Sequence, residues 1–343
     1  MTIFEINNRP IGPGHSTYII AEMSGNHGQS IERAKQIIQA AKHCGADAIK
    51  LQTYTADTIT IDCYKQPFMF KGQSLYQLYQ SAYTPWEWHS ELIQTAQDLN
   101  LDVFSTPFDS TAVDFLETLH VPAYKIASSE IVDIALLKKI AGTHKPIILS
   151  TGMATEAEIQ HAHEILGENG NTMLALLKCT ATYPSLPEEI NLRSIPAMAK
   201  RFGNIVGLSD HSMGHNIAVA SIALGASLVE KHLTLSRSDN SPDSEFSMEP
   251  HEFRAMVDGI RTVETAMGLE TYGPQGREDI SKKYRRSLFV VRDILAGDLI
   301  TESNVRSIRP SQGLHPEFLP KVLGRRARLD IETGTPLSWD LLI

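Results

Sequence analysis

Short apolar runs rich in β-branched residues recur along most of the chain, and each is followed by a polar turn and a longer stretch with helical spacing. Apolar runs of four to eight residues bounded by turn residues are typical of buried parallel strands. They predict eight strands, at residues 18–22, 48–52, 103–106, 124–128, 146–151, 174–179, 205–209 and 227–232.

The stretches between these runs repeat apolar residues every three or four positions, which predicts helices. Residues 30–44 begin at a serine suited to cap a helix and carry one apolar face. Further helices are predicted at residues 85–100, 111–119, 130–141, 156–166, 192–202 and 215–224. Strand and helix alternating over roughly 250 residues match a closed (β/α)₈ barrel better than an open sheet.

The pattern changes after residue 268. Residues 269–286 are polar, contain two glycines and one proline, and predict a linker. Residues 287–343 hold short β-like runs with glycine turns and no long helical pattern. We therefore expect an α/β barrel over residues 1–268, followed by a small, largely β domain over residues 287–343.

Composition narrows the class of protein. The chain has 343 residues, 42% of them hydrophobic and 21% charged, as in ordinary globular proteins. Its net charge of −9 and the lack of a dense basic block argue against nucleic-acid binding. Three cysteines without a CxxC pair, no apolar segment of membrane-spanning length and no signal-peptide pattern predict a cytoplasmic protein that contacts no membrane.

Polar and charged residues accumulate at the predicted carboxyl ends of the strands, where barrels of this type place their active sites. A single polar residue there usually caps the next helix, but polar residues at the end of nearly every strand predict a shared site. The residues concerned are Glu22, Lys50, Gln52, Ser105, Thr106, Lys125, Ser128, Glu130, Ser150, Thr151, Thr180, Tyr183, Ser209, Asp210, His211, Glu230, Lys231 and His232.

Two lysines, Lys50 and Lys125, lie inside the apolar runs AIKLQ and AYKIAS. A buried ammonium group has to be paired or has to bind an anion, because its desolvation is otherwise too costly. A structural ion pair with Glu22 or Glu230 is one explanation. The other, which we favour, is a phosphate or carboxylate site completed by the hydroxyl groups of Ser128, Ser150 and Ser209.

His211 and His232 end the last two predicted strands, so their imidazoles can approach one another although they are distant in sequence. Two imidazole ligands would leave open positions on a divalent metal ion, as carbonyl activation requires. A structural pair of histidines is the alternative.

In combination, the strand-end segments resemble the sialic-acid synthase family over essentially the whole chain. The matching segments are AEMSGNHGQS, ADAIKLQTYTADTIT, FSTPFD, PAYKIASSE, ILSTGM, KCTATYPS, GLSDHSMG, VEKHLTL, PDSEFSM and SIRPSQGLHP. The segments QTYTADTIT, SLYQLYQSAYTPWEWH, RRSLFVVRDI and RPSQGLHP are most similar to the pseudaminic acid synthase branch. The resemblance implies a (β/α)₈ TIM barrel followed by an antifreeze-protein-like (SAF) domain.

The resemblance also implies a reaction. The family's enzymes are C–C bond-forming transferases that condense phosphoenolpyruvate with an N-acetylated amino sugar and water, and release phosphate. For the pseudaminic branch the acceptor is 2,4-diacetamido-2,4,6-trideoxy-L-altrose. An N-acetylneuraminate or legionaminate synthase, a metal-dependent aldolase that uses pyruvate, and a non-catalytic carbohydrate-binding protein remain as alternatives.

Matching motifs imply roles for individual residues. His211 and His232 would bind Mn²⁺, Mg²⁺ or Co²⁺. From its position at the end of the fourth predicted strand, Glu130 is our choice as base for the attacking water, and with Glu22 and the two histidines it forms the expected catalytic set. The phosphoenolpyruvate phosphate would meet Lys125, Ser128, Ser150 and Ser209, and its carboxylate Lys50. The residues expected at the sugar are Glu22, Gln52, Thr106, Phe108, Tyr183, Asp243 and Arg309.

Arg309 belongs to the small domain, and the resemblance implies a domain-swapped homodimer in which that domain covers the partner's barrel mouth. Two positions depart from the family pattern. Ala181 stands where an asparagine usually donates to the phosphate, and Ser129 stands where the pseudaminic branch has a bulkier apolar residue.

Overall fold

Eight parallel strands close into a barrel in the order of the chain. The computed structural model describes residues 4–70 and 72–343. Within them the barrel strands are β3 (Tyr18–Glu22), β4 (Ala48–Thr53), β7 (Asp102–Pro107), β8 (Tyr124–Ile126), β9 (Ile147–Ser150), β10 (Leu174–Cys179), β11 (Ile205–Asp210) and β12 (Leu228–His232). Strand β12 pairs with β3 and closes the ring, which confirms the predicted (β/α)₈ class.

Inward-facing positions of the strands change from apolar to polar along each strand. Side chains alternate between the two faces of a strand, so Tyr18, Ile20 and Glu22 of β3 share the interior face. The first two belong to an apolar interior cluster, whereas Glu22 lies next to Lys50 of β4 in the sheet register. The barrel interior therefore has an apolar layer toward the amino ends and a polar layer at the carboxyl ends.

A short hairpin that the sequence analysis did not predict adds to the apolar layer. Strands β1 (Phe4–Ile6) and β2 (Arg9–Ile11) pair antiparallel before the first barrel strand. Their side chains Phe4, Ile6 and Ile11 belong to the same buried cluster as Tyr18 and Phe104 of the barrel. This packing places the hairpin at the apolar layer, away from the polar carboxyl ends.

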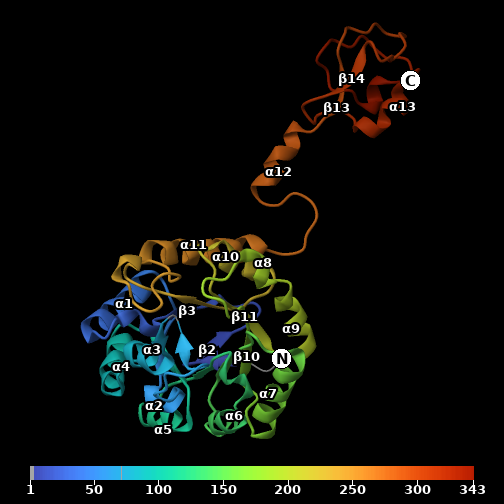
Figure 1. The fold of residues 1–343 in the computed structure, drawn as a ribbon. Coiled ribbons are helices and arrows are strands. Elements are labelled where there is room, and N and C mark those ends of the chain that lie inside the picture. Colours follow the sequence, from blue (N-terminus) through green and yellow to red (C-terminus); the bar gives the residue numbers. More distant parts are fainter. Residues whose placement is uncertain (1–3, 71) are drawn as a thin grey trace. The chain divides into compact units, whose positions relative to one another are not determined.

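Helices surround the barrel, as Figure 1 shows. They are α1 (Ile31–His43), α4 (His89–Asp98), α5 (Ser110–Thr118), α6 (Ile134–Ala141), α7 (Glu156–Glu168), α9 (Ser194–Phe202), α10 (Asn216–Ala223) and α11 (Pro250–Met267), with the single-turn α8 (Pro187–Ile190). Two predicted helices begin instead as 3₁₀ turns, Trp86–Trp88 and Glu130–Val132. Helix α11 was not predicted, although its residues at positions 253, 256, 257 and 260 form a buried stripe.

An insertion between β4 and α4 also went unpredicted. It contains α2 (Ala56–Ile59), the strand pair β5 (Met69–Phe70) and β6 (Gln73–Ser74), and α3 (Leu75–Ala82). Helix α3 has an apolar stripe at i, i+3, i+4 and i+7 spacing, yet none of its residues is buried. This stripe, formed by Leu75, Leu78, Tyr79 and Ala82, is available to line a cavity.

Contacts divide the chain into two units, residues 1–268 and 269–343. The second unit begins with α12 (Arg277–Ser281) and a 3₁₀ turn (Lys282–Tyr284) inside the predicted linker. Strands β13 (Ser287–Val290) and β14 (Val305–Ile308) pair antiparallel, and 3₁₀ turns (Pro316–Phe318, Trp339–Leu341) and α13 (Leu319–Val322) follow. The unit has its own core, which includes Leu288, Val305, Val322 and Leu337.

No helix in the described part of the chain combines the length and the apolar character that crossing a membrane would require.

Candidate active site

A cavity of about 680 Å³ lies at the carboxyl ends of the barrel strands. It collects residues from strands and loops that are far apart in the sequence. Of the residues that were given an individual role, all except Glu22 and Arg309 line it: Lys50, Gln52, Thr106, Phe108, Lys125, Ser128, Glu130, Ser150, Tyr183, Ser209, His211, His232 and Asp243. Of the other predicted strand-end residues, Glu230 lines the cavity, whereas Ser105, Thr151, Thr180, Asp210 and Lys231 do not. The expected convergence on one rim of the barrel is therefore present.

Glu22 lies beneath the cavity wall, fully buried. Its Oε1 accepts hydrogen bonds from the backbone N–H of Ser24 at 2.9 Å and from Nε2 of Gln52 at 3.1 Å. Its Oε2 lies 2.9 Å from Nζ of Lys50. Glu22 thus holds two cavity-lining side chains in place, and its predicted contact with a sugar stays a prediction.

Arg309 belongs to the second unit, where it is exposed on a shallow surface pocket with Tyr284, Arg285 and Arg286. Its predicted contact with the acceptor stays a prediction.

The two buried lysines converge on one carboxylate. Oε1 of Glu230 lies 2.9 Å from Nζ of Lys50 and 3.9 Å from Nζ of Lys125, and it accepts a hydrogen bond from the hydroxyl of Ser209 at 3.2 Å. Lys125 also donates to the hydroxyl of Ser150 at 2.6 Å. The ion-pair explanation of the lysines is therefore confirmed. The phosphate or carboxylate site stays a prediction, for which the two lysines and the hydroxyl donors line one cavity.

Burial and the neighbouring charges together determine the pKa values of Lys50 and Glu230 in this cluster. Burial lowers the pKa of Lys50 to about 8, and the repulsion from Lys125 adds to this effect, while the attraction of Glu230 opposes it. For Glu230, burial alone would raise the pKa, but the two lysines outweigh it and hold the pKa well below its usual range. Glu230 is therefore ionised. It was predicted as a strand-end residue of the shared site but was given no individual role; its position two residues before His232, on the same face of β12, is the signal.

His211 and His232 stand with ring centroids 5.3 Å apart. Nδ1 of His211 lies 2.9 Å from the carbonyl oxygen of Thr180, so this nitrogen is the donor and the tautomer that it selects has its lone pair on Nε2. Nδ1 of His232 is buried without a hydrogen-bond partner among the described residues. Burial lowers the pKa of His232 well below its usual value, which keeps the ring neutral.

These features fit a divalent metal ion, because an unpartnered buried imidazole nitrogen and a second lone pair are what such an ion requires. Within residues 4–70 and 72–343, no group of three or more histidine, cysteine, aspartate or glutamate side chains is placed to hold a metal ion. Two protein ligands would leave the other positions to water and substrate.

Aromatic rings pack around the two histidines. Phe246, from the loop after β12, lies 4.9 Å from the ring of His232, and Tyr183 lies 4.3 Å from the ring of His211. Burial raises the pKa of Tyr183, so its hydroxyl stays protonated at neutral pH. Phe246 was not predicted, because its loop gives no periodic signal.

Cys179 is a further cavity residue that the sequence analysis missed. Burial alone would raise its pKa, but hydrogen bonds with His211 and Ser128, together with electrostatic effects of His211 and Lys125, lower the pKa to about 7. Its inward position at the end of β10 was predictable from the alternation of that strand.

Two further carboxyl groups line the cavity. Burial raises the pKa of Glu130, while a 2.8 Å hydrogen bond from the hydroxyl of Ser129 to its Oε2 acts in the opposite direction. Burial likewise raises the pKa of Asp243, whose carboxylate accepts hydrogen bonds from the hydroxyl of Ser24 and the backbone N–H of Gly25. A carboxyl group with a raised pKa is suited to exchange protons with a substrate near neutral pH.

One wall of the cavity is apolar and comes from the insertion after β4. The α3 stripe (Leu75, Leu78, Tyr79 and Ala82) lines the cavity together with Ile59 and Phe70. Tyr54 joins this wall to the predicted sugar residues, because its ring lies 5.7 Å from that of Tyr79 and 5.1 Å from that of Phe108. The cavity thus combines charged groups with an apolar wall.

Curated relatives of this chain include nonulosonic acid synthases. The pseudaminic acid synthase of Helicobacter pylori is 44% identical over 94% of this chain and 96% of its own length. That of Campylobacter jejuni is 45% identical over 94% of this chain and 95% of its own length. The N,N'-diacetyllegionaminic acid synthase of Campylobacter jejuni is 36% identical over 92% of this chain and 98% of its own length.

Among solved structures, the spore coat polysaccharide biosynthesis protein SpsE of Bacillus subtilis covers the whole of this chain and 99% of its own, with a TM-score of 0.70 and 32% identity. Residues 285–343 match the SAF domain, and residues 37–272 match the NeuB family. With barrel, small domain and relatives in agreement, the chain is a member of the NeuB family of nonulosonic acid synthases.

Proposed function

We propose that the protein is a pseudaminic acid synthase, which condenses phosphoenolpyruvate with 2,4-diacetamido-2,4,6-trideoxy-L-altrose and water to give pseudaminic acid and phosphate. The observation that carries the proposal is the single cavity that gathers two lysines, three serines, a histidine pair and Glu130 at one rim of the barrel. The higher identity to pseudaminic acid synthases than to the legionaminic acid synthase supports this acceptor.

Phosphoenolpyruvate would bind at the lysine cluster. Lys125 and the hydroxyl of Ser150, already 2.6 Å apart, would donate to the phosphate together with Ser128 and Ser209. Lys50 would meet the carboxylate. Glu22 and Glu230, each 2.9 Å from its Nζ, keep the ammonium group oriented before the substrate arrives.

The histidine pair would hold Mn²⁺, Mg²⁺ or Co²⁺, which when bound supplies Lewis-acid polarisation of the sugar aldehyde. The protein's own contribution there is to keep His232 neutral and to exclude water from both imidazoles. Burial keeps His232 neutral, and the rings of Phe246 and Tyr183 cover the pair.

In the bond-forming step the π electrons between C2 and C3 of phosphoenolpyruvate form a bond from C3 to the aldehyde carbon of the open-chain sugar. The π bond of the aldehyde breaks, and its oxygen takes up a proton to become a hydroxyl group. Water then adds to the cationic C2, and Glu130 accepts the proton that this water loses. Collapse of the tetrahedral centre breaks the bond between C2 and the bridging oxygen, which leaves with inorganic phosphate. Burial of Glu130 raises its pKa, so the residue is a stronger base than an exposed carboxylate.

The apolar wall favours an acceptor with methyl groups over one with hydroxyl groups. A trideoxy sugar with two acetamido groups would place apolar methyl groups against the α3 stripe, whereas N-acetylmannosamine has a hydroxymethyl group at C6. Burying that hydroxyl without a hydrogen-bond partner would be unfavourable. The acceptor of legionaminic acid synthases would fit the same apolar wall. Only sequence similarity therefore favours the pseudaminic acceptor over the legionaminic one.

The proposal includes the family's assembly. A homodimer would bring Arg309 from one subunit to the acyl group of the sugar bound by the partner, and the protein would act in the cytoplasm. In such a dimer, Arg309 of one subunit would serve the barrel site of its partner. Mixing a variant that lacks Arg309 with a variant that is defective in the barrel site therefore tests the position of Arg309.

The test is to incubate the purified protein with phosphoenolpyruvate, Mn²⁺ and, separately, the trideoxy altrose, the legionaminic precursor and N-acetylmannosamine. Mass spectrometry of products and a phosphate assay should show the highest turnover with the altrose derivative. Preference for another sugar would reassign the acceptor. Turnover of pyruvate without phosphate release would indicate an aldolase, and sugar binding without any turnover would indicate a carbohydrate-binding protein.

A further inference from the structure

We propose that Asn26 is a positioning residue that holds the loop after β12 against the active-site cavity and thereby sets the affinity for the acceptor sugar. This loop, residues 233–248, carries Asp243 and Phe246 into the cavity. The inference rests on the proposed function, because it assigns these two residues to the acceptor side of the same site.

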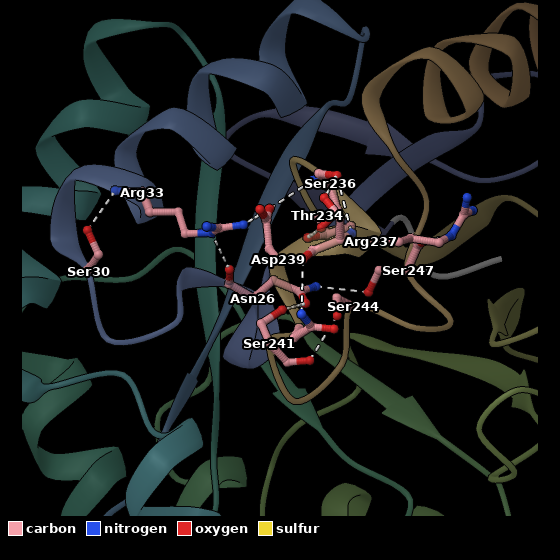
Figure 2. A network of polar contacts seen from close by, with 12 residues as sticks. Asn26, Ser30, Arg33, Thr234, Ser236, Arg237, Asp239, Ser241, Ser244 and Ser247 are labelled. Carbon is pink, nitrogen blue, oxygen red and sulfur yellow. Dashed lines mark hydrogen bonds and ion pairs between the residues drawn. The ribbon is translucent and has the colours of Figure 1, made fainter.

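Asn26 lies in the 3₁₀ turn Ser24–His27 after β3 and is completely buried. Its Nδ2 donates to the carbonyl oxygen of Leu233 at 3.0 Å and to the hydroxyl of Ser247 at 2.9 Å. Its Oδ1 accepts a hydrogen bond from the hydroxyl of Ser241 at 2.8 Å. One carboxamide therefore contacts the beginning, the middle and the end of the loop. Figure 2 shows Asn26 beside Ser241 and Ser247.

The contact with Ser247 continues to Asp243. The hydroxyl that accepts from Asn26 donates its own proton to the backbone carbonyl of Asp243 at 2.6 Å. The carboxylate of Asp243 accepts from the hydroxyl of Ser24, in the same turn as Asn26. Backbone and side chain of Asp243 are thus both held from the turn after β3.

The same loop positions Phe246, the residue before Ser247. Its ring packs 4.9 Å from His232 and 5.1 Å from Tyr183. If the loop moved away from the turn, Asp243 and Phe246 would both leave their places, whereas the lysines of the barrel strands would not. Loosening the loop should therefore affect the acceptor and leave phosphoenolpyruvate binding largely unchanged.

An outer set of contacts supports the turn and the loop from the side of the surface. Arg33 of α1 donates from Nε to the backbone carbonyl of Asn26 at 3.0 Å and forms an ion pair with Asp239 of the loop. Figure 2 shows Arg33 and Asp239 together on one side of Asn26. The partly exposed ion pair is a weaker tie than the buried carboxamide, because surface charges are screened by solvent.

The experiment compares Asn26→Ala and Asn26→Asp with the wild-type protein. Aspartate keeps the volume of the side chain and an acceptor for Ser241, but it loses both donated hydrogen bonds. Each variant should raise the KM for the acceptor roughly tenfold, with the KM for phosphoenolpyruvate changed less than about twofold. If Asn26→Asp raises the KM for the acceptor as much as Asn26→Ala does, the rise comes from the lost hydrogen bonds and not from lost packing.

Two gentler variants keep the inference testable if replacement of Asn26 prevents folding. Ser247→Ala removes the link to Asp243 and should show the same split between the two KM values. Ser241→Ala removes only the middle contact and should have a smaller effect. Ser238→Ala, at an exposed position of the same loop whose hydroxyl contacts Ser236, is the control and should leave both KM values unchanged.

Hydrogen exchange of residues 241–247 gives a readout that needs no turnover. Exchange there should be about tenfold faster in Asn26→Ala than in the wild-type protein, without faster exchange in the barrel strands. Unchanged exchange, or equal rises in both KM values, would overturn the inference. If the wild-type protein does not turn over the acceptor, the proposed function fails, while the exchange comparison still decides whether Asn26 holds the loop.

Discussion

The hydroxyl of Ser129 donates a 2.8 Å hydrogen bond to Oε2 of Glu130. Ser129 is the position at which the pseudaminic branch was expected to carry a bulkier apolar residue. The hydrogen bond stabilises the ionised carboxylate and so lowers the pKa that burial raises. The departure therefore tunes the residue that we propose as the base.

Replacing Ser129 by alanine should move the acidic limb of the pH–rate profile to higher pH. Loss of the hydrogen bond leaves burial less opposed, so the pKa of Glu130 rises further, and a base has to be ionised to act. Profiles of kcat/KM for both proteins measure the shift. Glu130→Gln should lower kcat by roughly 100-fold to 10,000-fold. If both variants kept the pH–rate profile of the wild-type protein, Glu130 would be excluded as the base.

Replacing Lys50 by methionine should destabilise the barrel by about 3 kcal/mol. Glu22 and Glu230 are buried, and each would lose an ammonium partner at 2.9 Å. Urea unfolding measures the free energy. The control is Lys139→Met, which removes an exposed ion pair to Asp114 and should cost less than about 1 kcal/mol. If both variants lost the same free energy of unfolding, burial of the cluster would not determine how much its ion pairs stabilise the barrel.

Replacing Leu78 by asparagine should raise the KM for the trideoxy acceptor about tenfold, because the apolar wall would lose a contact with a methyl group. The KM for phosphoenolpyruvate should stay the same. Gln80→Ala, on the exposed side of α3, is the matched control. An unchanged KM for the acceptor in Leu78→Asn would show that the wall contacts something other than the sugar.

Replacing His232 by alanine should weaken Mn²⁺ binding roughly 100-fold or more, because one of two imidazole ligands is lost. Calorimetric titration of Mn²⁺ into metal-free protein measures this without turnover. Chelation of metal should abolish the activity of the wild-type protein, and added Mn²⁺ should restore it. His251→Ala, an exposed histidine of the same unit, should bind Mn²⁺ as the wild type does. Full binding by His232→Ala would remove the metal from the proposal.

Replacing Gly207 by alanine should cost about 3 kcal/mol of barrel stability. A Cβ atom there would overlap the carbonyl oxygen of Leu228 and would lie 2.7 Å from side chains of Leu177 and Leu228. Thermal or urea unfolding measures the loss. Gly167→Ala has open space around the new methyl group and should be neutral or slightly stabilising. Equal stability of the two variants would contradict the packing of the barrel interior.

The strands and most of their rim residues were predictable because their signal is local. Alternation within β3 or β12 decides which side chains point inward, and the change from apolar to polar along a strand marks its carboxyl end. Helix α11 was missed although its buried stripe is regular, because no predicted strand followed to delimit it. Phe246 and Asp243 lie on a loop without periodicity, so Asp243 was found by resemblance alone and Phe246 was missed.

The amino-acid sequence by itself determined the strand–helix alternation and the inward face of each strand, because both follow from spacing along the chain. Its motifs carried the family resemblance and the chemical types gathered at the rim. Only the tertiary structure decided that Glu230 lies between two lysines, that α3 turns its apolar stripe to the cavity, and that Asn26 contacts three points of one loop. These relations join residues as many as 221 positions apart. Their geometry depends on closure of the barrel, which no local pattern encodes.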